Sequence, residues 1–191
     1  MSRILAIDPA NKQTAYVLFD KNAWEIYDKG IIPNKDFIKM LEKGNFDRVA
    51  LEIIVNMGVS GRTLYETAEY VGIYTYITNT LQKPLKRVKR TDVKKHFKVK
   101  RSTKDKKQPS ADSQIRTTLI ERFGEVGTKD NQGYFYGFKA DIWQAFAVGV
   151  YAVEKNKEKA WHAFSFLLLF RCNQGGHLNE TINKKYIRYK L

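Results

Sequence analysis

The chain opens with Ile4-Leu5-Ala6-Ile7-Asp8, a short run of strand-forming apolar residues that ends in a carboxylate. A polar turn at residues 10–13 separates this run from a second apolar segment, residues 14–19. Two strand-forming runs joined by a short polar turn predict a β-hairpin. We therefore expect the chain to begin with an antiparallel pair of strands, the first of which ends at Asp8.

The next segments extend this hairpin into an α/β arrangement. Residues 23–32 predict a third strand, and residues 37–41 have helical spacing up to Gly44. Residues 49–55 form a nearly continuous apolar strand interrupted by Glu52, and such continuity indicates a strand covered on both faces. Residues 85–88 predict another short strand. The sequence thus predicts a mixed sheet flanked by helices.

Three helices are expected in the rest of the chain. Residues 62–81 predict a long helix whose buried face holds Leu64, Ala68, Val71, Tyr74, Ile77 and Leu81. A second helix begins after Ser110, buries Ile115, Leu119 and Phe123, and ends at Gly124. After a glycine- and aromatic-rich loop at 126–139, residues 141–153 predict a helix that is buried except at its first turn. We expect one domain over residues 1–153 and a basic C-terminal extension over residues 154–191, which ends in the basic stretch 184–190.

The charge of the chain favours a polyanionic partner. The formal net charge is +14, and residues 83–107 contain 13 Lys or Arg against two Asp, a net +11. Each phosphate neutralised by a basic side chain releases condensed counterions, so such a segment favours nucleic acid. A solvated, partly disordered segment is the alternative. The candidate nucleic-acid-binding residues are Arg62, Lys86, Arg87, Lys89, Arg90, Lys95, Lys98, Lys100 and Arg101.

The sequence gives no sign of a membrane or export role. The apolar run at residues 163–170 is eight residues long and includes Ser165, whereas a spanning helix needs roughly 18 or more. The first residues lead directly into a strand pattern and do not resemble a signal peptide. Cys172 is the only cysteine, so no intramolecular disulfide is possible. We expect a cytoplasmic protein.

Three acids stand out because each lies in or next to an element built for the core. Asp8 ends the first strand, Glu52 interrupts the fourth, and Asp141 opens the last buried helix. Buried acids are costly unless they are paired or bind metal. Each acid alone has a structural explanation, such as a turn at Asp8-Pro9 or a helix cap at Asp141. A sheet with adjacent first and fourth strands would bring all three together.

A carboxylate cluster of this kind suits Mg²⁺ or Mn²⁺. Hard oxygen ligands are the ones these ions prefer, and two ions about 4 Å apart can activate water and stabilise the leaving oxygen in phosphodiester hydrolysis. We expect two ions per site, bound by Asp8, Glu52 and Asp141, in a nuclease.

The surroundings of these residues resemble those in the RuvC-like Holliday junction resolvases, particularly their phage-encoded branch. If the chain is phage-encoded as this resemblance implies, its expected location is the host cytoplasm. The resemblance rests on residues 4–10 with 14–16, on Leu51-Glu52-Ile53-Ile54 with residues 58–61, and on residues 111–116, 122–124, 126–129, 136–137 and 141–145. It covers roughly residues 3–153 and implies a ribonuclease H-like fold, a homodimer, and paired symmetric nicks in four-way DNA junctions during recombination and repair. Ala10 replaces the family's usual glycine.

The resemblance also assigns further site residues. Lys94 aligns with a lysine near the family's active site and would stabilise the phosphate or the leaving group, with Lys95 as a close competitor. RuvC proteins typically have an aspartate where this chain has Gln144. Asp112, Asp130 or water would complete the shell of the second ion, or that ion would bind weakly.

Two loops near the acids, residues 58–62 and 127–137, are candidates for DNA contact. Arg62, Tyr134 and Tyr136 would touch DNA or stack on exposed bases, and the alternative is that the aromatic residues fold onto the core. Because two like cuts require two identical sites, we expect a homodimer with residues 62–81 as its interface.

Three other functions fit parts of the sequence. One is a nuclease of the same fold that prefers flaps, forks or other branched nucleic acids, and another is a junction-binding protein without catalysis. The third, an ATP-dependent phosphotransferase, also begins with a strand-ending Asp, but it leaves the basic segment 83–107 unexplained.

Overall fold

The structure is a computed structural model that describes residues 2–55, 61–103 and 106–155. The part of the chain up to Val153 forms one compact unit. The predicted basic extension falls almost entirely on residues 156–191, outside the described residues, as do residues 163–170, Cys172 and the basic stretch 184–190. The division into a nuclease domain and an extension therefore stays a prediction.

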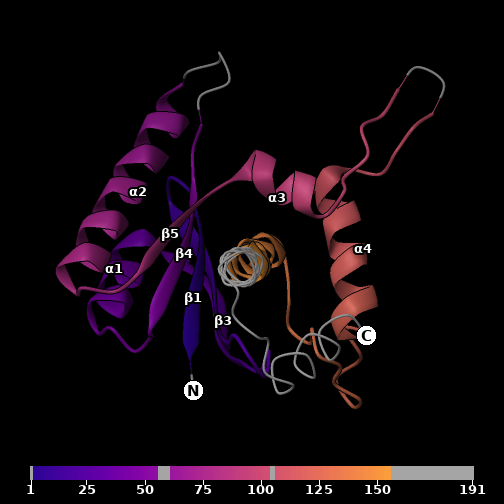
Figure 1. Ribbon diagram of the computed structural model, residues 1–191, viewed down its shortest axis with the longest axis horizontal. Coiled ribbons are helices and arrows are strands. Elements are labelled where there is room, and N and C mark those ends of the chain that lie inside the picture. The colour runs from indigo at the N-terminus through magenta and orange to yellow at the C-terminus, as the bar shows by residue number, and fades with distance from the viewer. Residues whose placement is uncertain (1, 56–60, 104–105, 156–191) are drawn as a thin grey trace, which may run out of the picture. The chain divides into compact units, whose positions relative to one another are not determined.

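A five-stranded mixed sheet forms the centre of the fold (Figure 1). Its strands are β1 (Arg3–Pro9), β2 (Gln13–Asp20), β3 (Ile26–Pro33), β4 (Arg48–Ile53) and β5 (Leu85–Lys89), in the spatial order β3-β2-β1-β4-β5. β1, β2 and β3 are antiparallel neighbours, whereas β4 pairs in parallel with both β1 and β5. The predicted hairpin and the predicted contact between the first and fourth strands are confirmed.

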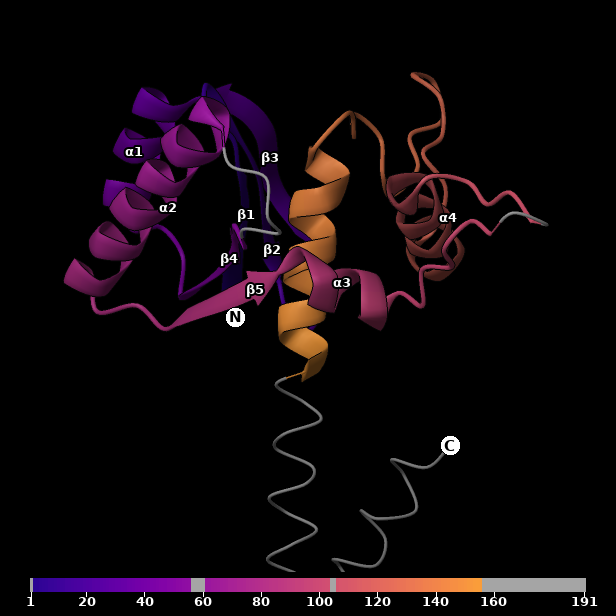
Figure 2. The same ribbon diagram turned by 90° about the horizontal axis from the view of Figure 1, so that it is seen from above.

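Helices cover both faces of this sheet. The helices α1 (Asn34–Glu42) and α2 (Arg62–Thr80) lie on one side, and the helix over residues 142–155 lies on the other, as Figures 1 and 2 show. The remaining helices are α3 (Arg90–His96), directly after β5, and α4 (Ala111–Phe123). The α/β fold class predicted from the sequence is confirmed.

The two faces of the sheet belong to two hydrophobic cores because side chains alternate along each strand. Leu5, Ile7 and Leu51 pack with residues of α1 and α2, including Phe37 and Tyr74. The intervening residues, such as Ala6, Ala50 and Val88, pack on the opposite face with residues of the helix over 142–155 and of α4. The small side chains at 6 and 50 allow that helix to approach the sheet closely.

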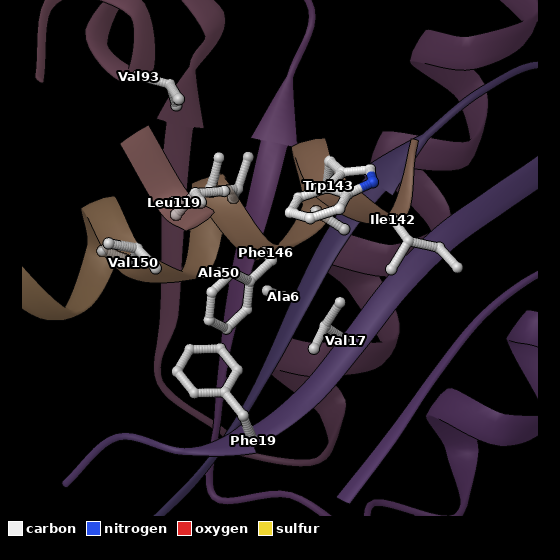
Figure 3. Packing of buried hydrophobic residues seen from close by; sticks show 14 of the residues in the cluster. Ala6, Val17, Phe19, Ala50, Val93, Leu119, Ile142, Trp143, Phe146 and Val150 are labelled. Carbon is white, nitrogen blue, oxygen red and sulfur yellow. The ribbon is translucent and has the colours of Figure 1, made fainter. Parts of the chain in front are cut away.

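Figure 3 shows the second core from close by, with Phe146 next to Phe19 and Ala6. The rings of Phe19 and Phe146 meet edge to face with centroids 5.3 Å apart. A Cβ added to Gly149 would lie 2.6 Å from the Phe19 ring and 2.9 Å from the Ala6 Cβ. Because carbon atoms prefer separations of about 3.5–4.0 Å, only glycine fits this contact without a shift.

Several element boundaries differ from the sequence expectation. The third strand begins at Ile26 instead of residue 23, because residues 20–24 form a turn in which Trp24 has a φ of +61°. The fourth strand ends at Ile53 instead of residue 55. The long helix and the strand after it match within one residue, and Ser110 caps α4 by accepting from the Ser113 amide.

The buried face predicted for α2 is partly wrong. Tyr74 and Ile77 are buried as expected, but Ala68 is exposed, and Thr67 and Thr78 are buried. Burial of these threonines is tolerated because their hydroxyls donate to the backbone carbonyls of Thr63 and Tyr74.

Across the described ranges, no helix combines the length and the apolar character needed to cross a bilayer.

Candidate functional site

The carboxyl ends of the parallel strands β1, β4 and β5 bring charged residues to one edge of the sheet. Ile7 of β1 pairs with Leu51 of β4, so the next residues, Asp8 and Glu52, lie side by side. Glu52 in turn pairs with Val88 of β5, and Arg90 follows the end of that strand. Ligand sites of open α/β sheets are built at this edge.

The alternation of side chains directs both acids to the same face. Asp8 stands two residues after Ala6, and Glu52 two residues after Ala50, whose side chains pack toward the helix over residues 142–155. Asp141 directly precedes that helix, and its carbonyl accepts from the amides of Gln144 and Ala145 in the first turn. The three acids named from the sequence therefore converge from three distant segments.

These residues line one cleft of about 450 Å³. Its charged and polar side chains are Asp8, Glu52, Asp141, Arg90, Gln144 and Gln13, and its other residues are Ala10, Ala15, Ile31 and Ala140. Asp8 and Glu52 are partly buried, while Asp141 is exposed. The spatial convergence predicted from the sequence is thus present, and the roles of the three acids stay a prediction.

The electrostatics of the cleft penalise its negative charge. Burial raises the pKa of Asp8 well above its ordinary value, with further contributions from the Glu52 and Asp141 carboxylates, while Arg90 opposes the shift. Burial also raises the pKa of Glu52, and Arg90 again opposes the shift. A nearby positive charge stabilises the ionised form of carboxylates that are partly buried and repel one another.

Arg90 supplies such a positive partner within the protein. Its Nη1 lies 3.5 Å from Glu52 Oε2, and its Nη2 donates to Asp112 Oδ1 of α4. The Arg90 side chain is 28% exposed and lines the cleft. The sequence predicts Arg90 only as a nucleic-acid-binding residue. Its position directly after β5, next to the strand that carries Glu52, is the signal that would have placed it in the site.

The cleft has the donor chemistry of a divalent-cation site without a ready-made geometry. Among the residues that the structure describes, no three His, Cys, Asp or Glu side chains are close enough to hold an ion together. Two buried oxygens of the cleft, Glu52 Oε2 and Gln144 Oε1, have no hydrogen-bond partner within the described protein. Carboxylate and amide oxygens suit Mg²⁺ or Mn²⁺, so the residues fit such an ion if side chains rotate toward it.

Lys94 lies near the acids without lining their cleft. It is exposed on α3 and lowers the pKa of Glu52, but less than Arg90 does. Lys95, its competitor, is exposed on the same short helix. Both lysines therefore stay candidates, with the Glu52 interaction favouring Lys94.

The other basic candidates lie along β5, α3 and the loop after it. Arg87, Lys89, Lys98, Lys100 and Arg101 are exposed, and Lys86 is half-buried. The loop is ordered at its base, where the Gln114 side chain accepts from the Lys100 amide and donates to the carbonyls of Lys100 and Pro109. The described part of the segment thus includes regular structure in β5 and α3, and for the loop after them a solvated, partly disordered segment stays the alternative prediction. Lys104 and Asp105 lie outside the described residues.

The structure bears differently on the two loops that were predicted to contact DNA, residues 58–62 and 127–137. Residues 58–60 lie outside the described residues, and Arg62 points to solvent with its Nε donating to Glu66. Tyr134 folds onto the core, where its ring stacks on Phe123 and its hydroxyl donates to the Trp24 carbonyl. The structural explanation therefore holds for Tyr134.

Comparison with known proteins supports the fold independently of the site. Two structures of RuvC from Thermus thermophilus are similar to this chain. One is RuvC in complex with a Holliday junction substrate (12% identity, TM-score 0.53), and the other is a structure of RuvC (11% identity, TM-score 0.55). Each match covers 82% of this chain and 96% of the RuvC chain. The fold is that of RuvC, the ribonuclease H-like α/β fold. No protein-family model and no curated protein sequence matches the chain.

Proposed function

We propose that this protein is a metal-dependent endonuclease that resolves Holliday junctions and related branched DNA by paired, symmetric nicks. The observation that carries the proposal is the cleft in which Asp8, Glu52 and Asp141 meet at the carboxyl edge of β1 and β4. Similarity to RuvC supports the choice of substrate, since one of the similar structures is a complex with a Holliday junction substrate.

In this proposal the three acids hold Mg²⁺ or Mn²⁺, with two ions per site as the sequence suggests. Bound divalent ions would lower the pKa of water and stabilise the leaving oxygen of the scissile phosphodiester. Asp8 and Glu52 orient the site from adjacent strands, and Asp141 approaches from the helix that covers them. Arg90 is placed to neutralise Glu52 in the free protein and to meet the phosphate when DNA is bound.

The basic surface supplies affinity for the DNA backbone. β5 and α3 lead from the acidic cleft to the loop that Gln114 fixes, and their exposed lysines and arginines follow the same path. Phosphate contacts of this kind position a duplex without reading its sequence. Selection of branched over linear DNA then depends on the arrangement of two such surfaces in a dimer.

We assign the dimer interface to an exposed apolar stripe on α2. Tyr65, Ile73 and Tyr76 occupy one side of this helix, and Tyr76 is 72% exposed. Exposed large apolar residues in one stripe favour a partner, and a two-fold pair matches the symmetry of a four-way junction. In sedimentation velocity, Tyr76→Arg is expected to shift a dimer to a monomer, whereas Thr63→Arg, on another side of α2, is not. A monomeric wild type would contradict the assignment.

The decisive experiment compares a synthetic four-way junction with a linear duplex of the same sequence. With Mg²⁺ or Mn²⁺ the wild type is expected to nick the junction at symmetric positions and to leave the duplex intact. Asp8→Asn should bind the junction with unchanged affinity and cut at least about a hundredfold more slowly, as expected for loss of a group that stabilises the transition state.

The same assay separates the two alternatives. Equal or faster cleavage of flaps and forks would indicate a broader branched-DNA nuclease. Junction binding without cleavage in either metal would indicate a non-catalytic junction-binding protein, the alternative that the absence of a fourth acid at Gln144 favours.

A further inference from the structure

Gln144 is a buried polar side chain in a helix whose neighbouring residues along the chain are apolar. Residues 142–150 are all buried, and Gln144 is 4% exposed among Trp143, Ala145 and Phe146. Burying an amide without hydrogen bonds costs free energy, and most buried polar groups therefore have partners. The Gln144 Oε1 has none among the residues that the structure describes. Its burial therefore needs an explanation other than the stability of the helix.

The position of Gln144 gives that explanation. It lies one turn after Asp141 and lines the same cleft as Asp8 and Glu52. The second buried oxygen of this cleft without a hydrogen bond is Glu52 Oε2, which lies 3.5 Å from Arg90 Nη1 in an ion pair. Two buried oxygens without hydrogen bonds thus belong to one acidic cleft.

We propose that the Gln144 amide oxygen is the fourth oxygen donor of the cation site, so that the site consists of three carboxylates and one neutral amide. The inference rests on the proposed nuclease function and names a residue that this function requires. The two carboxylates that were also candidates for this position are less suited to it. Asp112 is 61% exposed and bound to Arg90, Asp130 is exposed in the 127–137 loop, and neither residue lines the cleft.

The neutral donor has a consequence for metal binding. An amide oxygen can coordinate a hard cation, but it adds no negative charge to offset a second dication. The Arg90 guanidinium reduces the net negative charge of the cleft further. The site is therefore expected to bind one divalent ion more tightly than the other.

The test measures Mn²⁺ binding to the DNA-free protein by isothermal titration calorimetry, together with urea unfolding of the metal-free protein. Gln144→Leu is expected to bind Mn²⁺ about tenfold more weakly, in line with the loss of a group that supports a metal site. The same variant should unfold at a higher urea concentration, because it replaces an amide whose buried oxygen has no hydrogen-bond partner by an apolar side chain of similar size. Gln144→Asp should bind the ion at least threefold more tightly, and Asp130→Asn serves as the control that binds as the wild type does.

The outcomes distinguish this inference from the proposed function. If the wild type does not bind Mn²⁺, or Asp8→Asn binds it as well as the wild type, the proposed cation site fails and the inference fails with it. If Asp8→Asn weakens binding but Gln144→Leu changes it less than threefold, the assignment of Gln144 alone is overturned. If Gln144→Leu fails to fold, the Mn²⁺ affinity of Gln144→Asp tests the assignment of Gln144. An affinity of Gln144→Asp equal to that of the wild type overturns this assignment.

Discussion

Replacing Gly149 by alanine tests whether close packing of one helix on the sheet holds the cleft together. The new Cβ would lie 2.6 Å from the Phe19 ring and 2.9 Å from the Ala6 Cβ, so these groups must separate by about 1 Å to reach ordinary contact. The Phe19 ring cannot easily move away, because neighbouring rings hold it on two sides. It stacks on Trp24 with ring centroids 5.6 Å apart and meets Phe146 edge to face with centroids 5.3 Å apart. Overpacking of this kind costs about 1–3 kcal/mol.

Alanine also has a better helix propensity than glycine, which offsets about 1 kcal/mol of that cost. We expect Gly149→Ala to lower the free energy of unfolding by roughly 1 kcal/mol and at most about 2 kcal/mol. The matched control is Gly72→Ala in α2, where an added Cβ meets nothing within 4 Å. That control should raise the free energy of unfolding by about 0.5–1 kcal/mol.

Urea unfolding followed by tryptophan fluorescence measures both variants. Curves at two protein concentrations separate a change in packing from a change in self-association. Because the helix that carries Gly149 also positions Asp141 and Gln144, Gly149→Ala should in addition weaken Mn²⁺ binding, whereas Gly72→Ala should not. If the two variants are equally stable, the close approach of this helix to β1 is not the constraint described above.

Three further predictions concern single groups. In a single-turnover assay, Lys94→Ala is expected to slow junction cleavage about a hundredfold with little change in DNA affinity, and Lys95→Ala to slow it less than threefold. The reverse result would assign stabilisation of the phosphate or the leaving group to Lys95. Replacing Lys98, Lys100 and Arg101 together by alanine should weaken binding to all DNA forms. In a fluorescence-anisotropy titration, the slope of log affinity against log salt concentration should decrease in magnitude by about 3. An unchanged slope would show that this loop does not belong to the DNA-binding surface. Hydrogen bonds from the backbone amides of Ala23, Ser2 and Asn22 lower the pKa of Asp20 from an ordinary 3.8 to about 2. The ionised carboxylate therefore stabilises the fold above pH 3.8, and this stabilisation is lost as the pH falls toward 2. Asp20→Asn should therefore be less stable than the wild type at neutral pH, and a difference in urea midpoint that stays constant from pH 7 to pH 2 would contradict this.

The parts of the fold that follow from local patterns could be predicted from the sequence. Alternating and continuous apolar runs identified the strands, and the acids at 8, 52 and 141 stood out because each interrupts or borders such a run. Their convergence followed from one topological assumption, the adjacency of the first and fourth strands, which the parallel pairing of β1 with β4 confirms.

Features that depend on tertiary contacts could not be predicted in the same way. The buried face of α2 includes Thr67 and Thr78 because their hydroxyls find backbone partners, which hydropathy alone does not show. Arg90 was hidden in a run of basic residues, and only the pairing of β5 with β4 reveals that it lies next to Glu52. The loop position of Tyr134 favours DNA contact in the sequence, but in the structure its ring stacks on Phe123.

The order of the elements along the chain has a consequence for biosynthesis. The chain is synthesised from its N-terminal end, so a nascent chain that has reached α4 already contains the segments of the five described strands and both Asp8 and Glu52. It lacks the helix over residues 142–155, and the apolar face of Ala6, Val17 and Phe19 that this helix covers is still open to water. Translation must therefore proceed past that helix before the acidic cleft exists. A chain truncated ahead of residue 142 is expected to aggregate through the uncovered sheet.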